Sequence, residues 1–126
     1  VIARAKDYIN LPQNAVIVTD KKIQHAPDQA KTMIKGTIEA LRFIQTNKKE
    51  AIEILAAYSR SDRETATGMF ESYFPAYSRD GAMTNEALQA AVDDAVIRAK
   101  PEKKISLSQV ADRTLLTEAQ RELGTK

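Results

Sequence analysis

The chain contains 126 residues, of which 43% are hydrophobic and 29% are charged. This length limits it to one domain of ordinary size, and the composition is typical of a globular protein rather than a disordered or fibrous one. The absence of cysteine excludes disulfides, thiolate catalysis and cysteine-ligated metal sites. No apolar run approaches the ~20 residues that span a bilayer, which excludes a transmembrane helix in this sequence.

The charges are nearly balanced, with 19 basic and 17 acidic side chains and a net charge of +2. Acidic residues stand close to most of the short basic clusters, which are Lys21–Lys22, Lys48–Lys49 and Lys100 with Lys103–Lys104. A nucleic-acid-binding protein concentrates its positive charge on one face. We therefore expect a mixed, solvated surface and no nucleic-acid partner.

The first predicted element is a short buried strand from Ala15 to Thr19, which is apolar and rich in β-branched residues. Its hydrophobicity is continuous rather than alternating, which indicates cover on both faces, as in a parallel sheet. At most one other strand candidate exists, so the sequence does not supply the partners of a sheet. Because the chain also begins with Val1 and shows no signal-peptide pattern, we expect it to be a processed or excised part of a longer protein.

From Pro27 onward the sequence predicts helices. Hydrophobic residues recur with helical periodicity from Ala30 to Ile44, and Gly36 within this stretch predicts a close backbone approach. Further helices are predicted from their N-terminal and C-terminal signals. These signals are Asn47 with Glu50, Ser61 with Glu64, the turn Asp80–Gly81, Thr84 before and Pro101 after the next helix, and Asp112 and Gly124 at the two ends of the last one.

Four aromatic residues stand out because they recur at helical spacing: Phe70, Tyr73, Phe74 and Tyr77. This spacing places them on one face of a helix. The stripe is either part of the core or a partly open apolar surface that faces a ligand cleft or a partner.

The sequence contains few of the residue patterns that catalysis requires. His25 is the only histidine and has no carboxylate or cysteine at ligand spacing, and the adjacent pair Asp93–Asp94 points to different faces of a helix. There is no phosphate-binding glycine loop, nucleophile elbow or metalloprotease helix. We therefore predict no enzyme, no catalytic residues, no metal site and no cofactor.

The order of these segments resembles the C-terminal part of the periplasmic solute-binding proteins of ABC importers, of the alkanesulfonate-, taurine- and thiamine-pyrimidine-binding type. The resemblance covers nearly the whole chain. The matching stretches are LPQNAVIVT (11–19), APDQAK (26–31), EALRFI (39–44), NKKEAI (47–52), GAMTNEALQ (81–89) and VADRTLLTEAQRELG (110–124).

This resemblance implies an α/β, predominantly helical fold, namely the C-terminal portion of a two-lobed periplasmic-binding-protein fold with about five helices and one or two short strands. Residues 1–126 then form a single partial domain, in which 1–25 is the region of a crossing strand and 26–126 is the helical C-terminal part. Ligand-binding side chains are expected at Gln13, Asn14 and Thr19, near the cleft between the lobes.

The resemblance also implies the partners and the location. The partners are a small-molecule solute and the membrane permease of the importer, and the protein is periplasmic or an extracellular, membrane-anchored lipoprotein. A strand without its sheet favours dimerisation or domain swapping of the fragment.

Two other functions stay open from the sequence. The helical hairpins around 27–58 and 61–99 suit a repeat-like protein-interaction module, although no repeat of ~34 residues is found. The segment 106–124 resembles a helix-turn-helix of a small DNA-binding regulator, but Glu118 and Glu122 on the recognition helix oppose phosphate contacts.

Overall fold

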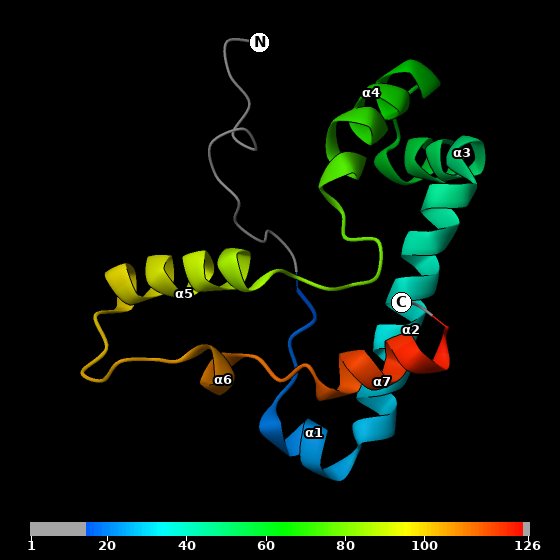
Figure 1. Cartoon of the computed structure of the whole chain (residues 1–126). Coiled ribbons are helices and arrows are strands. Elements are labelled where there is room, and N and C mark those ends of the chain that lie inside the picture. Colours follow the sequence, from blue (N-terminus) through cyan, green and yellow to red (C-terminus); the bar gives the residue numbers. More distant parts are fainter. Residues whose placement is uncertain (1–14, 125–126) are drawn as a thin grey trace.

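The computed structural model of the chain describes residues 15–124 (Figure 1). Helix makes up 73% of it, and the described residues contain no strand. The prediction of a predominantly helical protein is confirmed. The elements are α1 (Asp20–His25), α2 (Pro27–Thr46), α3 (Lys48–Ser59), α4 (Arg63–Tyr73), the 3₁₀ turn η2 (Phe74–Ala76), α5 (Asn85–Ala99), α6 (Leu107–Val110) and α7 (Thr114–Glu122).

The predicted strand at Ala15–Thr19 is wrong for the described chain. Residues 15–18 have no regular structure, and Thr19 is the N-cap of α1, with its Oγ1 accepting a hydrogen bond from the Lys22 backbone N–H at 3.2 Å. The physical reason is that β structure requires a neighbouring strand for its backbone hydrogen bonds. No such neighbour exists among residues 15–124, so the apolar segment is left exposed, with Ile17 at 90% of its full accessibility.

Helix α2 is the longest of the described helices, and α1, α3 and α7 all contact it (Figure 1). It begins at Pro27, as predicted, and α7 packs across it while α3 and α4 form a hairpin at its C-terminal end. No other segment packs closely against Gly36, since nothing lies within 4 Å of a Cβ added there. The prediction of a tight contact at this glycine is therefore wrong.

The predicted capping residues are partly corrected. Thr84 caps α5 as expected, with its Oγ1 accepting from the Ala87 N–H at 3.1 Å. Asn47 occupies the N-cap position of α3, as predicted, but its side chain makes no capping hydrogen bond, and its amide Nδ2 instead donates backward to the Phe43 carbonyl of α2 at 3.1 Å. The N-cap of α4 is Asp62 rather than Ser61, and its Oδ1 accepts from the Thr65 N–H at 2.8 Å.

The C-terminal predictions hold with one shift. Asp112 accepts a hydrogen bond from the Thr114 N–H at 2.8 Å, although the N-cap position of α7 falls on Arg113. Gly124 follows the helix with φ +63°, the left-handed conformation that ends many helices. Gly81, in the predicted Asp80–Gly81 turn, has φ +79°.

Hydrophobic burial is divided among separate contacts. Ala51, Ile52, Ala66 and Phe70 form the buried cluster of the α3–α4 hairpin. Ala30 and Ile38 of α2 and Ala119 of α7 are also buried, and α7 packs on α2. Helix α5 extends away from α2, and α6 packs beside it on the returning chain (Figure 1). We name this projection, residues 85–111, the α5–α6 arm.

Candidate functional site

The aromatic residues of the predicted stripe do not share one helix face. Helix α4 ends at Tyr73, because Pro75 has no backbone N–H to continue the helical hydrogen-bonding pattern, and Phe74–Ala76 form a 3₁₀ turn. Phe70 is buried and Phe74 is half-buried, whereas Tyr73 and Tyr77 are exposed. Only two of the four rings thus contribute to the core.

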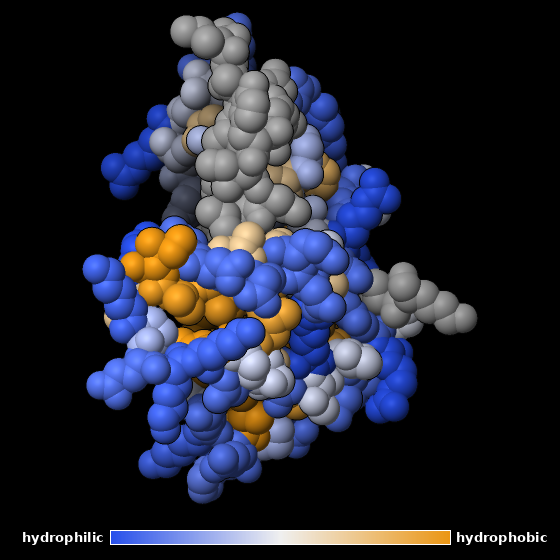
Figure 2. Space-filling model, turned by 60° about the vertical axis from the view of Figure 1, so that its left-hand side comes forward, coloured by the Kyte–Doolittle hydropathy of each residue, from blue (hydrophilic) through white to orange (hydrophobic). Residues whose placement is uncertain are grey.

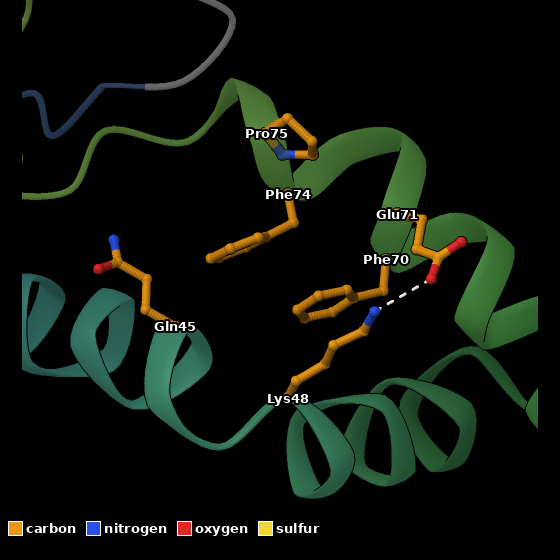
Figure 3. A pocket seen from close by; sticks show the side chains of 6 residues that line it. All are labelled: Gln45, Lys48, Phe70, Glu71, Phe74 and Pro75. Atoms are coloured by element: carbon orange, nitrogen blue, oxygen red, sulfur yellow. Dashed lines mark hydrogen bonds and ion pairs between the residues drawn. The ribbon is translucent and has the colours of Figure 1, made fainter.

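Phe70 and Phe74 form one wall of a pocket between the α2–α3 junction and the end of α4 (Figure 3). Their rings stack with centroids 4.8 Å apart and an angle of 15° between planes. The pocket has a volume of about 250 Å³ and is completed by Gln45, Lys48, Glu71 and Pro75.

The two charged side chains of this pocket pair with each other. The Lys48 ammonium lies 3.0 Å from the Glu71 carboxylate and 5.8 Å from the centre of the Phe70 ring. The amide of Gln45 reaches toward the pocket from the opposite side (Figure 3). With its cation neutralised, the pocket suits an uncharged, partly apolar group better than an anion.

The residues predicted to bind ligand are not assembled into this pocket. Gln13 and Asn14 lie outside the described residues, and Thr19 caps α1. The Thr19 hydroxyl accepts one hydrogen bond and keeps its own hydrogen free to donate. Sequence reasoning missed the pocket itself, although the aromatic stripe was the signal that pointed to its wall.

A second polar arrangement fixes α7 on α2. Lys31 lies 2.9 Å from Glu122 and 3.3 Å from Glu118, and Lys35 lies 3.0 Å from Glu122. The Arg42 guanidinium donates two hydrogen bonds of 3.1 Å to the Leu123 carbonyl. We name these contacts the α2–α7 clasp.

The clasp affects the titration of its charged members. Hydrogen bonds from Lys31 and Lys35 hold the pKa of Glu122 below its ordinary value, and the bonds to Glu122 and Glu118 raise the pKa of Lys31. The charges of the clasp therefore stabilise one another and hold α7 against α2.

His25 and the acidic residues show no sign of a metal centre. The Nδ1 of the exposed His25 lies 2.9 Å from the Lys21 carbonyl. Within residues 15–124, no three or more histidine, aspartate or glutamate side chains are grouped so that they could hold a metal ion. None of the described helices is both long and apolar enough to cross a bilayer.

Comparison with known proteins found no matching family model, no similar curated protein and no similar solved structure.

Proposed function

We propose that this chain is the C-terminal part of the substrate-binding component of an ABC importer. Such a component captures a small solute in a cleft between two lobes and delivers it to a membrane permease by hinge closure, without covalent chemistry. The proposal includes a periplasmic or lipid-anchored location and ligand contacts from Gln13, Asn14 and Thr19.

The observation that carries the proposal is the state of residues 15–18. They are apolar, and Val16, Ile17 and Val18 are β-branched, yet residues 15–18 have no partner strand in the described part of the chain, and Ile17 is almost fully exposed. An exposed run of this kind is costly in water and prone to pairing. A crossing strand whose sheet is built by other polypeptide accounts for both its sequence and its exposure.

The assignment is tested by comparing amide hydrogen exchange in two proteins. One is the complete protein encoded by the reading frame that contains this chain, and the other is residues 1–126 alone. We expect slow amide exchange at Val16, Ile17 and Val18 in the complete protein and fast exchange in residues 1–126 alone, because only the complete sheet protects these amides. Fast exchange at these amides in both proteins would overturn the proposal.

Ligand binding provides the second readout. Taurine, a linear alkanesulfonate and a thiamine-type pyrimidine are tested against the complete protein by thermal unfolding. At a hundred times its Kd, a bound solute stabilises a protein by about 2.7 kcal/mol. We expect stabilisation by one of the three and a weaker effect in Thr19→Ala than in Thr19→Ser, which keeps the hydroxyl.

A helical interaction module is the second candidate, and the outer face of α3 favours it. Ile54 and Tyr58 lie one turn apart on α3, and Tyr58 is 88% exposed. If the complete reading frame contains only helical patterns and no α/β pattern, this candidate replaces the first.

The DNA-binding alternative has the least support. Helix α6 is a single turn, and α7 packs on α2 with Glu118 and Glu122 paired to lysines. A salt-dependent gel shift of duplex DNA is the result that would favour it.

A further inference from the structure

The far end of the α5–α6 arm carries a concentrated positive charge. Four basic residues fall between positions 98 and 104, against the single acidic residue Glu102: Arg98, Lys100, Lys103 and Lys104. The three lysines are exposed and form no ion pair in the described chain, whereas Arg98 pairs with Asp94. We name residues 97–105 the arm tip.

The arm tip also exposes an aliphatic side chain. Ile97, in the last turn of α5, is 72% exposed, and Pro101 and Ile105 are partly exposed. Figure 2, turned so that this side of the molecule comes forward, shows hydrophobic side chains gathered among hydrophilic ones that project outward. An apolar residue bordered by unpaired lysines is complementary to a surface that is negatively charged outside and apolar beneath.

The shape of the arm narrows the choice of partner. The chain turns back after α5 at the end farthest from α2, so the arm tip is convex and projects from the body (Figure 1). A convex tip fits a broad surface better than a groove or a helix. The tip has no aromatic side chain with which to stack on bases. The three unpaired lysines of the tip are each attracted to an anionic lipid surface by ~1 kcal/mol.

We infer that the arm tip docks on the surface of an anionic lipid bilayer, with Lys100, Lys103 and Lys104 at the headgroups and Ile97 at the interface. This contact is peripheral and reversible. It goes beyond the proposed function and does not rest on it, because it uses only residues that the structure describes.

Vesicle co-sedimentation of the 126-residue chain tests the inference. The probes are vesicles of phosphatidylcholine alone and vesicles with about one-third phosphatidylglycerol. We expect binding only to the anionic vesicles, weakened by added salt because screening shortens the reach of exposed charges. Replacing the three tip lysines by glutamine is expected to lower the partition coefficient about a hundredfold.

Matched variants separate a docking site from general charge. Lys21→Gln, Lys22→Gln and Lys49→Gln together remove the same charge from other exposed positions, and we expect this triple variant to keep most of the binding. Ile97→Gln is expected to weaken binding, and Ile97→Trp to strengthen it. All these residues are exposed, so circular dichroism should show an unchanged helix content.

Several results would overturn the inference. Equal binding to neutral and anionic vesicles would do so, as would equal loss in the two lysine triple variants or no binding to either kind of vesicle. Binding of the arm tip to duplex DNA or to an acidic peptide, with no binding to anionic vesicles, would assign the tip to a different partner. None of these outcomes bears on whether residues 15–18 belong to a larger sheet.

Discussion

Phe70 is the largest of the four buried residues in the α3–α4 hairpin and is 8% exposed. It stacks on Phe74 and lies beneath the Lys48 ammonium. Truncating a buried phenylalanine removes its transfer free energy and leaves a cavity, which costs about 3–5 kcal/mol. We therefore expect Phe70→Ala to lower the free energy of unfolding by about this amount in urea denaturation.

Tyr73 provides the matched control for Phe70. It lies three residues later on the same helix and belongs to the same sequence stripe, but it is 61% exposed. Tyr73→Ala should change the free energy of unfolding by less than about 0.5 kcal/mol. Equal losses of stability in the two variants would contradict the structure, in which Phe70 is buried and Tyr73 is exposed.

Two glycines provide a second matched pair at the residue scale. Gly81 has φ +79°, and a Cβ added there lies 3.4 Å from the buried Ile38 and 3.5 Å from Leu116. Gly81→Ala is expected to destabilise by about 1–2 kcal/mol through its left-handed backbone.

Gly36 gives the opposite expectation. It lies within α2 with open space around it, so Gly36→Ala should stabilise by up to about 1 kcal/mol, since alanine has the higher helix propensity. Thermal unfolding of the two variants checks the opposite signs. A loss of stability in Gly36→Ala would contradict the open environment described for α2.

The α2–α7 clasp makes the docking of a single helix dependent on pH. The pKa of Glu122 is lowered in the folded state, so its contribution is present above its unfolded pKa and is lost as the pH falls through the folded value. The pKa of Lys31 is raised, so its contribution is present below its unfolded pKa and is lost as the pH rises through the folded value. The clasp is therefore strongest from about pH 5 to pH 10.

Hydrogen exchange of the α7 amides measures this dependence. We expect protection of α7, corrected for the intrinsic exchange rate, to fall below about pH 4. The control is Glu122→Gln, which keeps the shape of the side chain but cannot titrate, and its acid-induced loss should be smaller. An identical pH profile in the variant would remove Glu122 from the clasp.

At the element scale, helical periodicity was a sufficient signal for the main helices. The repeat beginning at Ala30 predicted α2, and the signals Thr84 and Pro101 predicted α5. A local cap such as Thr84 is readable because its partner lies three residues away. The aromatic stripe failed as a single face because Pro75 interrupts the helix, a signal that was present in the sequence but outweighed by the spacing.

Elements that depend on distant partners were harder to predict. Residues 15–18 have the composition of a strand, but composition cannot provide the neighbouring strand that stabilises one. The same reason applies to the pocket. It combines Gln45 with Phe74, residues brought together only by the packing of α3 on α4, and no local pattern links them.

At the scale of the whole molecule, the described chain consists of several packed units rather than one continuous core. The α3–α4 hairpin encloses its own cluster, whereas the buried Ile38 and Ala119 lie outside that cluster, on α2 and α7, which pack together. Gln120 adds a link from α7 to the turn before α5, donating to the Asp80 carbonyl at 3.0 Å. Units joined by so few contacts are expected to open separately.

This division predicts how far the effect of a substitution spreads. Phe70→Ala removes the centre of the hairpin cluster, so it should accelerate amide exchange in α3 and α4 and leave α7 nearly unchanged. Leu116→Ala, on the α7 side of the turn at Gly81, should accelerate exchange in α7 and leave α3 and α4 protected. The two patterns are complementary, so each variant is the control for the other. Uniform acceleration throughout the chain in both variants would instead show that α2 couples the α3–α4 hairpin and the α2–α7 contact into one cooperative unit.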